Sequence, residues 1–99
     1  MAGGGLPSAF ALHGNAPNPF QPKTDIRFDL PRSGHVVLEI FGVDGRRVRT
    51  LADGPMDAGR KSVSWDGRDS AGHPLGSWIY FYRLQAGENK AVRKMTLIR

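Results

Sequence analysis

The most informative stretch of this chain is Asn18-Pro19-Phe20-Gln21-Pro22, which is followed by Thr24-Asp25-Ile26-Arg27-Phe28-Asp29-Leu30. The prolines lack an amide hydrogen and hold φ near about −65°, so the chain is extended and non-helical up to the second run. In that run Ile26, Phe28 and Leu30 alternate with polar residues, which is the period of a half-buried strand. An all-β domain is therefore predicted to begin here, with these three side chains on its inner face.

Working outward, further short strands are predicted on both sides of this run. Residues 36–41 and 47–51 flank the pair Asp44-Gly45, a strong signal for a hairpin, so these two strands are expected to pair antiparallel. After a turn-rich stretch that includes Asp53-Gly54-Pro55, residues 61–65 place Val63 and Trp65 on one face. The other predicted strands are residues 9–12, at an edge, and residues 79–86 and 91–98.

No helix is predicted. Thirteen glycines and seven prolines interrupt the chain, and no window has apolar residues at helical spacing with caps at both ends. The pattern predicts an all-β, immunoglobulin-like antiparallel β-sandwich of about seven strands, with a small barrel as the alternative. Trp65 is expected to be the core aromatic between the two sheets. Residues 9–99 are expected to form the sandwich, and residues 1–8, with Gly3-Gly4-Gly5, a flexible linker or junction.

Composition limits the partners. The 99 residues are enough for one domain with a modest core, and the absence of cysteine rules out disulfides and thiolate sites. The net charge of +5 is spread over strands and turns, and only Lys90, Arg93, Lys94 and Arg99 gather near one end, so nucleic acid is not expected as a partner.

No membrane-spanning or leader segment is predicted. There is no run of about 18 apolar residues, so no transmembrane segment is expected. Residues 1–12 lack a basic region and a long enough apolar run for a signal peptide. If the domain acts outside the cytoplasm, its export signal is expected on a parent chain or has been removed.

Catalysis and metal binding are not expected either. His13, His35 and His73 are isolated, without a zinc motif, a nucleophile elbow or paired carboxylates around them. The carboxylates Asp44, Asp57, Asp66 and Asp69 fall in predicted loops and are hard-oxygen donors, but Asp-Gly pairs are first of all turn chemistry. We therefore predict no enzyme activity, no metal site and no cofactor.

Several motifs occur together in a specific order along the chain. They are Asn15-Ala16-Pro17-Asn18-Pro19-Phe20, Thr24-Asp25-Ile26-Arg27-Phe28, Val43-Asp44-Gly45-Arg46-Arg47-Val48, Ala58-Gly59, Trp65-Asp66-Gly67-Arg68-Asp69, Tyr80-Phe81-Tyr82-Arg83-Leu84 and Lys94-Met95 closing at Arg99. In these motifs the chain resembles the C-terminal sorting domains of the type IX secretion system and the related immunoglobulin-like domain of the flagellar hook-capping protein. The resemblance covers about residues 10–99.

The resemblance implies a domain that directs an attached cargo protein across the bacterial outer membrane to the cell surface or the exterior. Secretion machinery, or another protein, would then be its partner. Two positions depart from the family pattern: Gln21 stands where Asn is usual, and Trp78 stands where Gly is usual. The second departure replaces backbone freedom with a bulky ring.

Recognition is expected at the final strand and its tail, through Lys94, Met95, Leu97 and Arg99, with Trp78 as a further partner-binding residue. Trp78 either packs at the sheet edge beside Tyr80 and Tyr82 or exposes its ring to a partner.

Two alternatives stay open. One is a structural assembly module that uses its edge strands. The other is an accessory carbohydrate-binding module, since Trp78, Tyr80 and Tyr82 share one face of a strand.

Overall fold

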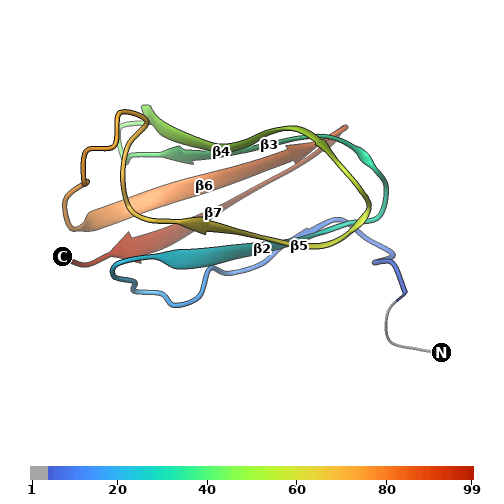
Figure 1. Ribbon diagram of the computed structural model, residues 1–99, viewed down its shortest axis with the longest axis horizontal. Helices are drawn as coiled ribbons and strands as arrows, with labels where there is room; N and C mark the ends of the chain where they lie inside the picture. The colour runs from blue at the N-terminus through green and yellow to red at the C-terminus, as the bar shows by residue number, and fades with distance from the viewer. Residues whose placement is uncertain (1–4) are drawn as a thin grey trace.

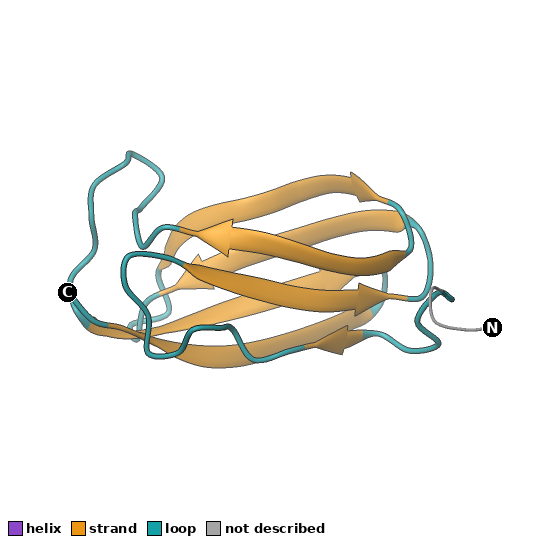
Figure 2. Ribbon diagram, turned by 60° about the horizontal axis from the view of Figure 1, so that its bottom comes forward, coloured by secondary structure: helices purple, strands orange, loops and turns teal. Residues whose placement is uncertain are grey.

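Two antiparallel sheets face each other in the computed structural model, which describes residues 5–99 (Figure 1). The three-stranded sheet has the order β1 (Ala11–Leu12), β2 (Thr24–Leu30), β5 (Gly59–Trp65). The four-stranded sheet has the order β4 (Arg47–Met56), β3 (Gly34–Phe41), β6 (Trp78–Ala86), β7 (Asn89–Leu97). The predicted immunoglobulin-like β-sandwich of about seven strands is confirmed. Figure 2 shows strands and loops but no helix in the described residues.

The core lies between the sheets and follows the period-2 pattern. Ile26, Phe28 and Leu30 are fully buried on the inner side of β2, as predicted. Val36, Leu38 and Ile40 of β3 and Tyr82 and Leu84 of β6 face them from the other sheet. Trp65 is 1% exposed and lies edge-on to Tyr80 with 5.6 Å between ring centroids, so its predicted place as the core aromatic is confirmed.

The hairpin around Asp44-Gly45 forms as predicted. Gly45 has φ +81°, and the amide of Arg46 donates to Asp44 Oδ1 at 3.0 Å. The strands on either side, β3 and β4, pair antiparallel, with Phe41 opposite Arg47.

One predicted turn is wrong. Asp53-Gly54-Pro55 belongs to β4, where these residues pair with Val37, Val36 and His35. The strand tolerates Pro55 because β4 lies at the edge of its sheet, where one side of the strand has no ladder partner. Two register shifts in the β3–β4 ladder further bend this edge. The other strand boundaries agree with the sequence prediction to within about two residues.

The N-terminal segment is described only from Gly5 onward. The Gly5 carbonyl accepts a hydrogen bond from Arg60 Nη1 at 3.1 Å, and Pro7 is buried. Residues 1–4, which belong to the predicted linker, lie outside the described residues, and the boundary at residue 9 stays a prediction. No helix in the described part of the chain has the length and apolar character needed to cross a membrane.

Candidate functional site at the loop end of the sandwich

One end of the sandwich carries Arg99 and borders Trp78, two of the residues that the sequence singled out. It carries the 42–46 turn, the loop of residues 66–77 and the C-terminus, all at the left of Figure 1. We call this the loop end. Most of its loop backbone is held by hydrogen bonds, so it offers a surface of fixed shape.

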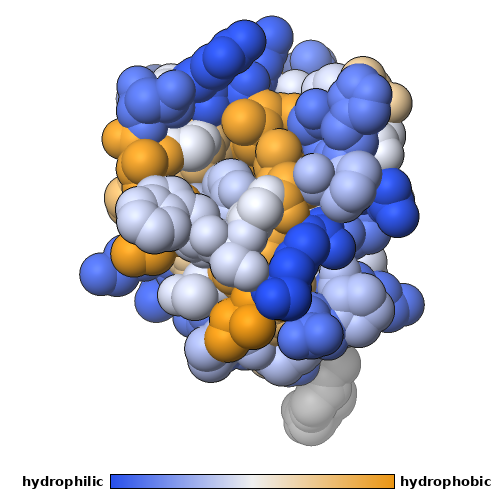
Figure 3. Space-filling view, turned by 90° about the vertical axis from the view of Figure 1, so that its left-hand side faces the viewer, coloured by the Kyte–Doolittle hydropathy of each residue, from blue (hydrophilic) through white to orange (hydrophobic). Residues whose placement is uncertain are grey.

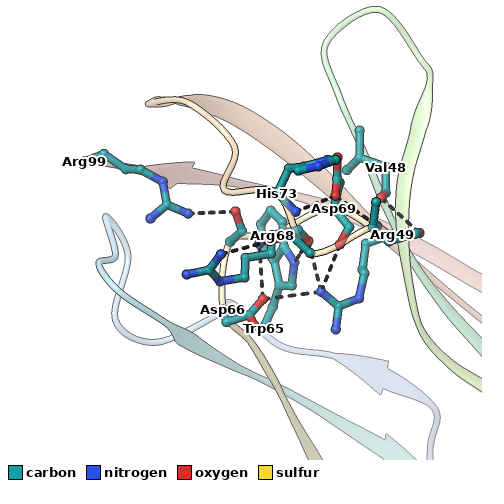
Figure 4. A network of polar contacts seen from close by, with 12 residues as sticks. Val48, Arg49, Trp65, Asp66, Arg68, Asp69, His73 and Arg99 are labelled. Carbon is teal, nitrogen blue, oxygen red and sulfur yellow. Dashed lines mark hydrogen bonds and ion pairs between the residues drawn. The ribbon is translucent and has the colours of Figure 1, made fainter.

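The 66–77 loop is tied to β4 and to the core tryptophan (Figure 4). Trp65 Nε1 donates to the carbonyl of Arg68 at 2.9 Å, which satisfies the one polar atom of this buried ring. Arg49 Nη1 donates to the same carbonyl at 3.0 Å and lies 3.3 Å from Asp66 Oδ1. The amide of Ser70 donates to the carbonyl of Val48 at 3.0 Å. The loop is therefore fixed against both sheets.

The loop carboxylates are engaged with the loop's own backbone. Asp69 Oδ1 accepts the amides of Ala71 at 3.0 Å and His73 at 2.9 Å, and Asp66 Oδ1 accepts the amide of Arg68 at 3.1 Å. The hydrogen bond from the His73 amide lowers the pKa of Asp69. Desolvation opposes this shift, and the hydrogen bond from the Ala71 amide adds to it. Among residues 5–99 no three metal-binding side chains cluster together. These aspartates act as turn caps.

Arg99 closes the loop end. Its Nη2 donates to the carbonyl of Gly67 at 2.7 Å, its Nε donates to the carbonyl of Leu75, and its backbone amide donates to Ser77 Oγ at 2.7 Å. A Cβ at Gly67 would come within 2.7 Å of this Nη2. Arg99, predicted as a partner-binding residue, thus also fixes the loop from within the chain.

Trp78 stands at the rim of an open groove of about 620 Å³. The groove is lined on one side by the 42–46 turn and on the other by Ser70, Ala71 and Leu75. The side chain of Trp78 is 61% exposed and that of Val43 56%. Figure 3 shows apolar surface running across this end between polar groups. Trp78 is therefore largely open to solvent rather than packed at the sheet edge beside Tyr80 and Tyr82.

Trp78, Tyr80 and Tyr82 do not form the flat exposed platform that the alternative of a carbohydrate-binding module requires. The three residues do share one side of β6, but that side faces the core, and Tyr80 and Tyr82 are 7% and 0% exposed. Their hydroxyls donate to the carbonyls of Gly76 at 2.9 Å and His13 at 2.7 Å. Burial raises the pKa of both tyrosines. Only Trp78, at the start of β6, extends beyond the core into solvent.

The tail residues separate into two groups. Met95 and Leu97 are 0% exposed and belong to the core, whereas Lys94 lies on the outer face of β7. A partner of the folded domain therefore reaches the side chain of Lys94 but not those of Met95 and Leu97.

The edge of β7 is also partly covered. The Thr96 amide donates to Asn18 Oδ1 at 2.9 Å, and Phe20 exchanges backbone bonds of 3.0 Å with Thr96 and Ile98. The proline-rich segment thus closes the C-terminal half of this edge.

One polar site escaped the sequence prediction. Glu39, on the outer side of β3, is 6% exposed and forms ion pairs with Arg83 at 2.8 Å and Arg47 at 3.0 Å. Burial disfavours the charged carboxylate, but the hydrogen bonds and charges of Arg83 and Arg47 outweigh it and lower the pKa of Glu39. The one available signal was an acidic residue within an apolar strand.

The domain is a small immunoglobulin-like β-sandwich. Two sheets pack around a core that includes Trp65, and residues 5–99 contain no helix. Residues 14–95 match the family model of the FlgD Ig-like domain, and the chain belongs to this family. No curated protein sequence matches it significantly.

Solved structures share the fold. Latent dimeric PorU from Porphyromonas gingivalis is 22% identical, with a TM-score of 0.66 over 90% of this chain and 9% of PorU. FlgD from P. aeruginosa is 24% identical, with a TM-score of 0.60 over 75% of this chain and 58% of FlgD. PorZ, a surface component of the type IX secretion system of P. gingivalis, is 16% identical, with a TM-score of 0.62 over 89% of this chain and 11% of PorZ. The chain thus spans a small part of PorU and PorZ.

Proposed function

We propose that this domain is a non-catalytic sorting module that directs an attached cargo protein through outer-membrane secretion to the cell surface or the exterior. The observation that carries the proposal is the ordered set of motifs, which lies on a fold shared with domains of PorU and with PorZ, a type IX secretion component. The partner would be a protein of the secretion machinery.

The folded domain limits which residues such a partner touches. Trp78 and Lys94 are exposed, and Arg99 shapes the loop beside them. Met95 and Leu97 would contribute by holding β7 in place, since both lie in the core. Recognition would then involve the loop end and the outer side of β7 rather than the buried side chains of the tail.

A reporter fused upstream of the domain tests this in a host with type IX secretion. Trp78→Glu combined with Lys94→Glu is expected to leave the reporter in the periplasm, while the unaltered domain brings it to the surface. The matched control is Arg27→Glu combined with Ser62→Asp on the outer face of the other sheet, which changes charge without touching the proposed residues. Equal export of both variants would refute the proposal.

A structural assembly module is a second candidate, and the match to the FlgD Ig-like domain favours it. In that case edge strands such as β5, which pairs with a strand on one side only, would join copies or partners. Light scattering over a concentration series is expected to show a rising mean mass. A mass that stays at that of the monomer, 10.8 kDa, would refute assembly from this domain alone.

A further inference from the structure

The outer face of the four-stranded sheet carries a second organised surface, next to the loop end. Because β6 and β7 bury Tyr80, Tyr82, Leu84, Met95 and Leu97, the alternate residues point outward. The outward residues Phe41, Ile79, Phe81 and Val92 are apolar. We call these four residues, with Glu39, Arg47, Arg83, Lys90 and Lys94, the sheet face.

The cross-strand register makes the sheet face continuous. Phe41 lies directly opposite Phe81, and Phe81 lies opposite Lys94. One row further along, Glu39 lies opposite Arg83, and Arg83 lies opposite Val92. Val92 is 55% exposed and Ile79 37% exposed, so apolar side chains remain open to solvent in the same area.

Arg83 is fixed at the centre of this face. Its Nη2 donates to Glu39 Oε1 at 2.8 Å, and its guanidinium carbon lies 4.7 Å from the ring centroid of Phe41. Arg47 Nη1 holds the second carboxylate oxygen at 3.0 Å. A rigid Arg surrounded by aromatic and aliphatic side chains is the composition that protein interfaces concentrate in their centres, because little conformational entropy is lost on binding.

The charges on the sheet face are unbalanced. Arg47, Arg83, Lys90 and Lys94 are basic, whereas Glu39 is the one acidic member and is already bound to two guanidinium groups. Asp53, at the far corner of the sheet, pairs with His35 at 2.7 Å. Two copies stacked by this face would bring like charges together, which disfavours self-association and favours a partner that carries carboxylates.

We propose that the sheet face docks an extended protein segment whose facing side alternates carboxylates with aliphatic side chains. The aliphatic groups would cover Phe81 and Val92, and the carboxylates would pair with Lys90 and Lys94. The sheet face borders the loop end, sharing Arg47 with its groove and Lys94 with the proposed recognition surface, but the proposal does not depend on whether the domain sorts cargo.

A synthetic peptide that alternates pairs of Glu with pairs of Leu is the probe, because each side of such an extended chain carries both groups. NMR spectra of the isotope-labelled domain are expected to show saturable shifts confined to β3, β6 and β7. The same peptide with Lys in place of Glu, or with Ser in place of Leu, is expected to bind at least about tenfold more weakly. Shifts centred on the 66–77 loop or on the β1–β2–β5 sheet would overturn the proposal.

Two sheet-face variants and one control variant locate the binding. Val92→Asp with Lys94→Glu is expected to weaken the Glu/Leu peptide at least about fivefold, whereas Arg27→Glu with Ser62→Asp, which changes the charge equally, leaves affinity unchanged. If Val92→Asp with Lys94→Glu lowers the melting temperature, Lys90→Glu with Lys94→Glu replaces it, because this variant keeps Val92. Unchanged peptide affinity in a folded sheet-face variant would overturn the proposal. So would binding of heparin, a polyanion without aliphatic side chains, by the unaltered domain as tightly as the Glu/Leu peptide. Failure of cargo export with intact peptide binding would count against the sorting function alone.

Discussion

Gly67 is the residue at which the loop end is most sensitive to substitution. Its φ of +74° strains any other residue, and its added Cβ would lie 2.7 Å from Arg99 Nη2. Gly72, at φ +89° in the same loop, has open space around a Cβ and provides the matched control. Gly72→Ala is expected to cost about 1–2 kcal/mol of unfolding free energy, from backbone strain alone. Gly67→Ala is expected to cost about 1 kcal/mol more, because it displaces a charged donor. Urea titration measures both, and equal losses would contradict a role for Arg99 in fixing the loop.

Glu39 makes stability depend on pH on the acidic side. Its pKa is below 4.5 in the folded domain and is expected near 4.5 in the unfolded chain, so the unfolded state takes up the proton first as the pH falls. The stabilisation from Glu39 is therefore complete above about pH 4.5 and is lost as the pH falls through the folded pKa. Glu39→Gln is expected to flatten this part of the curve when melting temperatures are compared between pH 3 and pH 7. An unchanged acid slope in the variant would contradict the assignment.

The residue pattern predicted which side of a strand a residue lies on better than it predicted whether that residue is buried. The period of β6 correctly places Trp78, Tyr80 and Tyr82 on one side of the strand, but it does not tell how far the opposite sheet extends. Tyr80 and Tyr82 meet that sheet and are buried, whereas Trp78 meets the groove formed by two loops. Those loops come from residues 42–46 and 66–77, whose approach depends on the folded chain as a whole.

Local signals in the sequence predicted where the strands lie. They did not predict how far a strand extends when its place in the sheet allows a proline. Alternation located β2 to the residue, and Asp44-Gly45 located the β3–β4 hairpin. The extension of β4 through Asp53-Gly54-Pro55 was not predictable, since only an edge position makes a proline acceptable there. Edge position is a property of the assembled sheet.

The edge of β7 is expected to open when its side-chain cap is removed. Asn18→Ala deletes the acceptor of the Thr96 amide, a bond of 2.9 Å, and should cost about 0.5–1.5 kcal/mol. Hydrogen exchange of the Thr96 amide is expected to accelerate, while amides in β2 stay protected. Asn89→Ala is the control, because Asn89 lies in β7 like Thr96 but does not contact the Thr96 amide. Similar exchange at Thr96 in both variants would show that the Phe20 backbone bonds alone protect this edge.

For the whole molecule, composition and strand count were enough to predict the β-sandwich, but the strand order was not. The pairing of β2 with β5 joins segments far apart in the sequence, with Ile26 opposite Val63, and no local signal specifies it. The sheet face has the same origin: Phe41, Arg83 and Val92 become neighbours only after β3, β6 and β7 have paired. Sites assembled from three strands are invisible to a pattern that extends over ten residues.

The fold also determines how the tail must be tested. Removing residues 94–99 deletes Met95 and Leu97, both fully buried, and the partners of Phe20 at the β7 edge. Loss of two core side chains costs about 2–5 kcal/mol each, against a total stability of about 5–15 kcal/mol for a domain. The truncated domain is therefore expected to lose its cooperative thermal transition and the near-ultraviolet dichroism of Trp65, while full-length Lys94→Glu keeps both. A cooperative melt within a few degrees of the intact domain would contradict the core role of the tail. If the prediction holds, failure of a truncated domain to export its cargo reflects unfolding, and only substitutions at exposed residues such as Lys94 and Trp78 test recognition.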